Sequence, residues 1–170
     1  MAAGVSYLDE TLGAWRDVRE GLIEEVKNIP AGDFEFRPTP EVRSVRELVQ
    51  HILEVAMMMT GELSRVDTDL KRAPWPDLLA MYASAAYDAT TKTDLVRLLE
   101  TQMDQAERQF RKSGERALFQ QMENFDGSMW TKFQWLHHGI AQEMYHRGQL
   151  TLYARLLGRE PALTRRIRGE

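Results

Sequence analysis

The 170-residue sequence contains no cysteine. This absence excludes disulfide bonds, thiolate metal ligands and a cysteine nucleophile, and it is compatible with a reducing compartment. Any reaction of this protein that uses a thiol must therefore take the thiol from another molecule.

Long hydrophobic runs are also missing. No apolar stretch approaches the ~18 residues that a membrane-spanning helix needs. The first residues, MAAGVSYLDETLGAW, lack the basic and apolar regions of a signal peptide. We therefore expect a cytoplasmic protein without a membrane partner.

An excess of positive charge is the third feature that the sequence lacks. The formal net charge is −4, whereas a general nucleic-acid-binding protein needs a broad basic surface to release counterions. The basic run TRRIR at 164–168 is short, and we expect it to be a solvated terminus. The sequence thus predicts no nucleic-acid partner.

The residues that are present indicate one helical domain over residues 1–170. Hydrophobic residues make up 43% and charged residues 28% of the chain, a composition typical of a folded domain. Apolar residues recur at three- and four-residue steps in four long segments, which capping residues open and glycine or proline closes. The four expected helices run from Ser6 to Ile29, Ser44 to about Val66, Thr91 to Ser113, and Met129 to Leu157.

The connections between these helices are less regular. A short helix is expected over Asp77 to Tyr87, and Asp126-Gly127 is typical of a turn. The rest of the segment from Glu115 to Ser128 is ambiguous, and we find no strand of period two and no internal repeat. The sequence therefore predicts an all-α four-helix bundle with a long connection between the second and third long helices.

The stretch AQEMYHRGQL at 141–150 differs by one residue from the zinc motif HExxH. That motif places two imidazoles one helical turn apart with a glutamate between them, but here Gln142 replaces the first histidine. At 100° per residue, Gln142 and His146 share a helix face that should point into the bundle, and Gly139 on that face leaves room beside them. Glu143 lies 60° from His146, which favours a surface or seam carboxylate over a catalytic base.

Two sharper interpretations of this motif fail. A zincin protease needs both imidazoles of HExxH and a third ligand, and Gln142 removes one imidazole. A ferritin-like di-iron centre needs Glu-x-x-His on each of two helices, and only Glu143 to His146 supplies that spacing. His51, at the border of the second helix's apolar stripe, could face His146 at a helix–helix seam or be an ordinary packed histidine.

Apolar residues also lie away from the His146 face of the last helix. Ile140 and Met144 are on the opposite side, and a helix that is apolar on nearly all sides needs a covering partner. We therefore expect a homodimer that uses part of this helix. Gln149 is placed to orient His146, to line the pocket, or to form a seam hydrogen bond.

Two runs of the sequence resemble the DinB/YfiT-like family of four-helix-bundle metalloenzymes. They are QWLHHGIAQEMYHRGQLTLYARLLGREPALT and FRPTPEVRSVRELVQH, and the agreement in order and spacing extends over roughly residues 5 to 165. The resemblance implies one divalent metal, zinc or nickel, bound by a histidine of the second helix and two of the last. His51 and His146 match two of these positions, and Gln142 departs from the pattern at the third.

The same resemblance implies a function. Family members with a role are similar to S-transferases that use a low-molecular-weight thiol, such as bacillithiol, mycothiol or glutathione, on a small electrophile. An amide oxygen is a weaker ligand for zinc or nickel than an imidazole, and His138 is a poorly placed substitute. The alternative is a non-catalytic dimeric stress-response or small-ligand-binding bundle with a degenerate metal site.

Overall fold

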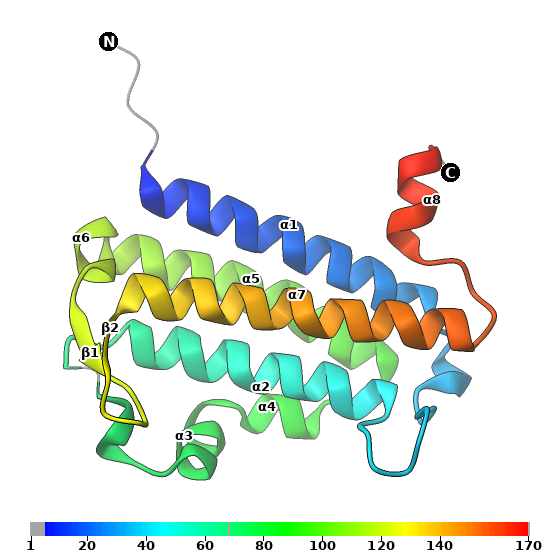
Figure 1. The fold of residues 1–170 in the computed structure, drawn as a ribbon, viewed down its shortest axis with the longest axis horizontal. Helices are drawn as coiled ribbons and strands as arrows, with labels where there is room; N and C mark the ends of the chain where they lie inside the picture. Colours follow the sequence, from blue (N-terminus) through cyan, green and yellow to red (C-terminus); the bar gives the residue numbers. More distant parts are fainter. Residues whose placement is uncertain (1–5, 68, 170) are drawn as a thin grey trace.

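Four long helices form the body of the molecule in a computed structural model that describes residues 6–67 and 69–169. They are α1 (Tyr7–Asn28), α2 (Val45–Leu63), α5 (Lys92–Ser113) and α7 (Lys132–Leu156) (Figure 1). The predicted all-α four-helix bundle is confirmed. No helix within these residues is both long enough and apolar enough to cross a membrane.

Side-chain caps fix where these helices begin. The Ser6 and Thr91 hydroxyls accept hydrogen bonds from the backbone amides of the residues three positions on. Ser44 with Glu47 forms a complete capping box at α2, and Thr131 with Gln134 forms another at α7. Each cap satisfies backbone donors that a helix start leaves free, so the starts of α1, α2 and α5 follow from the sequence.

The long helices pack as a ring in which α1 and α2 each contact both α5 and α7. Helices α1 and α7 run in one direction, while α2 and α5 run in the other (Figure 1). The chain must therefore travel back along the bundle between α2 and α5. The antiparallel contact between α2 and α7 brings the first half of α2 beside the second half of α7.

The return from α2 to α5 contains α3 (Trp75–Tyr82) and α4 (Ser84–Asp88). A single helix over Asp77 to Tyr87 was expected, but it breaks at Ala83, where φ is −113° and ψ is 16°. Ala83 is fully buried, and the break lets both short helices pack against α2.

A small hairpin precedes α7, which corrects the expectation that the chain has no strand. Strands β1 (Gln121–Glu123) and β2 (Met129–Thr131) pair antiparallel around the turn at Asp126-Gly127. Gly127 has φ +86°, a conformation that glycine adopts without strain. The last long helix consequently starts at Lys132 rather than Met129, because Met129 pairs with Glu123 in the hairpin.

Two further helices occupy the ends of the bundle, α6 (Glu115–Leu118) and α8 (Ala162–Arg168). The basic run at 164–168 is helical and its arginines are exposed, so the expected solvation of this segment is confirmed. The buried Glu25 carboxylate of α1 accepts a 3.1 Å hydrogen bond from the Ala162 amide. This contact attaches the start of α8 to the bundle, and α8 packs against α1.

Candidate functional site

The rings of His51 on α2 and His146 on α7 lie face to edge across the α2–α7 seam. Their centroids are 5.0 Å apart and their planes meet at 84°. His146 is 7% exposed, and the His51 side chain is 16% exposed. Of the two positions considered for His51, the structure shows the one that faces His146 across the seam.

Gln149, one turn beyond His146, fixes the orientation of the His146 ring. Its Oε1 atom lies 2.7 Å from His146 Nδ1. An amide oxygen only accepts hydrogen bonds, so the pair requires a proton on Nδ1 and leaves the lone pair on Nε2. Histidines that bind metals are oriented in the same way, by a partner on the second ring nitrogen. Of the roles considered for Gln149, the structure therefore shows two: it orients His146, and it lines the hollow described below.

Glu54 stands beside His51, a neighbour that the sequence reasoning missed. Its Oε2 atom is 3.6 Å from His51 Nδ1, which is longer than a hydrogen bond. Burial raises the pKa of Glu54, and this effect is opposed by the charge of Arg43 and a hydrogen bond with Tyr87. The spacing of three residues between His51 and Glu54 was the available signal, since side chains three apart share a helix face.

Both histidines are held in the neutral form. Burial lowers the pKa of His51 to about 4, helped by the positive charge of Arg43 and by His146. Burial also lowers the pKa of His146; the Gln149 hydrogen bond opposes this, and the charge of Arg43 adds to it. A neutral imidazole is the form that binds a metal.

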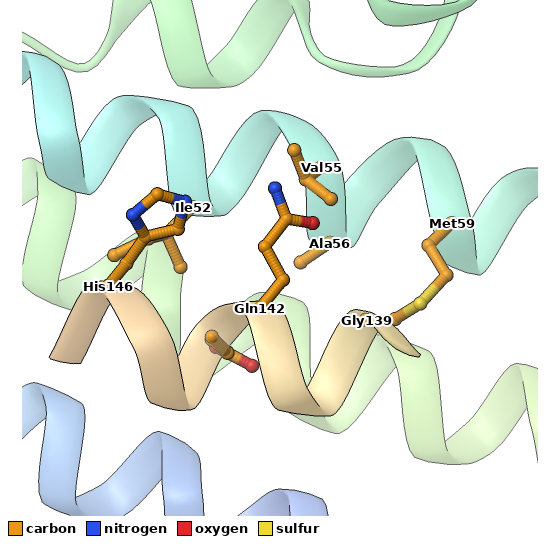
Figure 2. Close-up of a pocket in the computed structure, with 8 residues that line it drawn as sticks. Ile52, Val55, Ala56, Met59, Gly139, Gln142 and His146 are labelled. Atoms are coloured by element: carbon orange, nitrogen blue, oxygen red, sulfur yellow. The ribbon is translucent and has the colours of Figure 1, made fainter. Parts of the chain in front are cut away.

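Gln142 lies one turn before His146 and points from α7 towards Val55 on α2 (Figure 2). The two side chains line one internal cavity of about 10 Å³, which is roughly the space of one water molecule. The room expected beside Gly139 is filled, because a Cβ atom there would lie 2.0 Å from the Met59 sulfur. The shared face of Gln142 and His146 is thus confirmed, and Met59 rather than open space adjoins it.

Glu143 belongs to a separate network in the α1–α7 seam. The carboxylate is buried and accepts hydrogen bonds from Trp15 Nε1 and Arg19 Nε. Arg19 is 1% exposed and also donates at 2.8 Å to Gln102 Oε1. Of the positions expected for Glu143, the structure shows the seam. The angle on the helix could not reveal its partners, which lie 124 and 128 residues away.

On the solvent side of His146 the surface opens into a hollow of about 540 Å³, which we call the outer hollow. Tyr153 lines this hollow and donates a 3.0 Å hydrogen bond to the Arg43 carbonyl oxygen. The residues that line it are Glu41, Val42, Arg43, Leu48, Tyr145, His146, Gln149 and Tyr153. One histidine of the pair is therefore reachable from solvent through a space of small-molecule size.

The donor set fits a divalent metal in part. Within residues 6–67 and 69–169, no three His, Cys, Asp or Glu side chains converge into a group that could hold a metal ion. Two neutral imidazoles suit zinc or nickel, and the Gln142 amide is the remaining donor on the same face. His138 is not a substitute, because it is exposed and packs against Trp130 and Trp135 near the hairpin.

Comparison with known proteins agrees with this architecture. The family model described as the DinB family matches residues 4–168. No curated protein matches the sequence.

Solved structures share the fold at low sequence identity. A DinB-like protein from Bacillus subtilis is 20% identical, with 88% of this chain and 92% of that chain covered and a TM-score of 0.66. YfiT from Bacillus subtilis, described as a probable metal-dependent hydrolase, is 14% identical, with 94% of each chain covered and a TM-score of 0.72. A mycothiol-dependent maleylpyruvate isomerase is 14% identical with a TM-score of 0.68, and the match covers 85% of this chain but 61% of that one.

Proposed function

Because the chain belongs to the DinB family, we propose that it is a divalent-metal-dependent enzyme with His51, His146 and Gln142 as its metal-binding residues. The observation that carries this proposal is the meeting of two neutral histidines across the α2–α7 seam, 5.0 Å apart at their ring centroids. Zinc and nickel are the proposed metals, since both bind imidazole nitrogen well.

The protein's own residues prepare these ligands. Gln149 holds the His146 ring with its Nε2 lone pair free, and the Glu54 carboxylate faces His51 Nδ1. Burial keeps both imidazoles unprotonated. A metal bound there would lower the pKa of a bound water or thiol towards neutrality.

We further propose that the reaction is transfer of an external low-molecular-weight thiol to a small electrophile. The chain supplies no thiol of its own, because it contains no cysteine. The outer hollow beside His146 gives both reactants a place of suitable size. Among proteins of this fold, one is a mycothiol-dependent isomerase and one a probable metal-dependent hydrolase, so hydrolysis is the competing reaction.

The second candidate is a non-catalytic bundle with a degenerate metal site. Gln142 favours it, since replacing an imidazole by an amide weakens a metal site. The internal cavity of about 10 Å³ also leaves little space on the α2 side of His146. A dimeric stress-response or small-ligand-binding role would need only the outer hollow. The cytoplasmic location and the absence of a nucleic-acid partner stay predictions from composition.

Metal analysis of protein purified without a nickel column separates the two candidates. The enzyme proposal expects one zinc or nickel per chain after equilibration with the metal, and loss of that metal in both His51→Ala and His146→Ala. The matched control is His138→Ala, which removes an exposed histidine of the same helix and should keep the metal. Equal metal content in the wild type and both site variants would refute the proposed site.

A further inference from the structure

Arg43 is one of the residues that line the outer hollow. Within the described residues its guanidinium makes no hydrogen bond or ion pair. Arg43 is exposed in the loop just before α2. The two other arginines near it, Arg37 and Arg46, do have carboxylate partners. Arg37 pairs with Glu47 at 3.2 Å, and Arg46 pairs with Glu35 at 2.6 Å. One arginine of this loop region is therefore left available to a ligand.

The backbone of Arg43 is held in place from two sides. Tyr153 of α7 donates to its carbonyl oxygen at 3.0 Å, and the next residue, Ser44, is the cap of α2. Phe36 packs edge to face on Tyr153 with centroids 6.0 Å apart. The origin of the side chain is thus fixed relative to His146, so binding an anion would require ordering of the side chain but no ordering of the backbone.

Arg43 lines the outer hollow together with His146 and Tyr153. Its positive charge, like that of Arg37, opposes the rise that burial causes in the pKa of Tyr153. The other lining residues include the apolar side chains of Val42 and Leu48, the ring of Tyr145, and one carboxylate, that of Glu41. A ligand with an apolar body and one negative group would match Arg43 and the apolar part of this lining.

We propose that Arg43 is the substrate-binding arginine of this site and selects small organic anions that carry a carboxylate. A guanidinium offers a planar pair of N–H donors that fits the two oxygens of a carboxylate. The anion would lie in the outer hollow with its apolar body against Val42 and Leu48 and its far end next to His146. That this anion is a substrate rests on the proposed function, whereas its recognition by Arg43 does not.

The test compares phenylacetate with phenylacetamide, which have nearly the same shape and differ in charge. Both are titrated calorimetrically into metal-free protein at fixed low ionic strength. We expect phenylacetate to bind the wild type at least about tenfold more tightly than the amide, because hydrogen bonds to charged groups are the stronger kind. Arg43→Gln should abolish this preference, Arg43→Lys should keep part of it, and added salt should weaken it.

The matched control is Arg46→Gln, which removes an arginine three residues away that is already bound to Glu35. It should leave the preference for phenylacetate unchanged. Equal binding of the two probes by the wild type, or an Arg43→Gln variant that still prefers the anion, would overturn the inference.

A separate zinc titration of the same proteins distinguishes this inference from the proposed function. Zinc binding with no preference for the anion would refute the role of Arg43 and leave the metal site standing. Preference for the anion without zinc binding would support the role of Arg43 and refute the metal site. The outer hollow would then be an anion-binding site of a non-catalytic bundle.

Discussion

Gln142 is the residue at which the site departs from the three-histidine pattern that the family resemblance implies. It lies on the same face of α7 as His146 and lines the same cavity. An imidazole at this position would start from the same backbone and point in the same direction, towards α2 (Figure 2).

We therefore predict that Gln142→His binds zinc or nickel about 100-fold more tightly than the wild type, a difference of about 2.8 kcal/mol. Calorimetric titration of both proteins measures it, with His146→Ala in each background as the blank. Unchanged affinity would mean that the surroundings of position 142 no longer converge on the two histidines. Tight binding that survives His146→Ala would place the metal elsewhere.

Gln149 provides a second prediction at this scale. Its Oε1 atom accepts the His146 Nδ1 proton at 2.7 Å, and loss of such a partner typically lowers metal affinity about 10–100-fold. Gln149→Leu keeps a similar size and removes the acceptor, so its zinc affinity should fall by that factor. Gln149→Glu keeps the acceptor and should retain at least the wild-type affinity, whereas a Gln149→Leu variant that binds zinc normally would contradict the orienting role.

The low pKa of His51 predicts how the metal-free protein responds to acid. In the unfolded chain this histidine takes up a proton near its ordinary value of 6.5, but in the folded protein only near 4. Between these values the unfolded state binds more protons, so stability is highest above pH 6.5 and falls as the pH drops towards 4.

At about 1.36 kcal/mol per pKa unit, the loss attributable to His51 is on the order of 1–3 kcal/mol. Urea unfolding of the wild type and His51→Leu at pH 7.5 and pH 4.5, both with a chelator, measures it. Glu54 contributes with the opposite sign because its pKa is raised, and comparison with the variant separates the two. Equal pH dependence in both proteins would show that His51 is not the responsible group.

At the scale of elements, the α1–α7 seam depends on the buried pair of Arg19 and Glu143. Both side chains are almost inaccessible, at 1% and 3% exposed. Removing one partner of a buried ion pair typically costs about 3–5 kcal/mol, because the other charge stays behind in the interior.

We predict a loss of that size for Glu143→Gln in denaturant unfolding. The matched control is Glu107→Gln, since Glu107 pairs with Arg16 at the surface and such a pair contributes at most about 1 kcal/mol. Once folded, Glu143→Gln should keep the wild-type zinc affinity, because both carboxylate oxygens of Glu143 are bonded to Trp15 and Arg19, although the residue also lines the pocket of Gln142 and His146. A selective loss of metal binding with unchanged stability would assign Glu143 to the site after all.

The elements differ in how well the sequence predicts them. The caps at Ser6, Ser44 and Thr91 use local hydrogen bonds, so three helix starts could be read from neighbouring residues. The hairpin could not, because its strands have three residues each, too few to establish a period of two. The start of α8 was missed for another reason: its anchor, Glu25, is 137 residues away.

The residues of the site likewise differ in how well the sequence predicts them. His51 and His146 could be paired from helix faces and the family pattern, because both are set by the period of the α-helix. Arg43 could not be assigned, since its position depends on Tyr153, which is 110 residues distant. Sequence reasoning therefore finds residues positioned by their own helix and misses those positioned by contacts between elements.

At the scale of the whole molecule, one face of α7 remains uncovered. Met144, Leu152 and Leu156 are 47%, 52% and 56% exposed, and they lie within 120° of one another around the helix axis. Gly148 on the same face has open space where a Cβ would lie. Ile140, expected on this face, is instead partly buried against the core, so the exposed strip begins one turn later.

A contiguous apolar strip of this kind is typical of a surface that a partner covers. We predict a homodimer in which the two α7 helices pack against each other, with Gly148 allowing close approach of the backbones. Light scattering should show a dimer at tens of micromolar for the wild type and a monomer for Leu152→Lys, because burying an unpaired lysine in the contact is costly. Met81→Lys is the matched control, since Met81 is 54% exposed on α3 and its variant should stay dimeric.

His146 lies on another face of α7, so the Leu152→Lys monomer should still bind zinc. Loss of the metal together with the dimer would mean that the second copy completes the site.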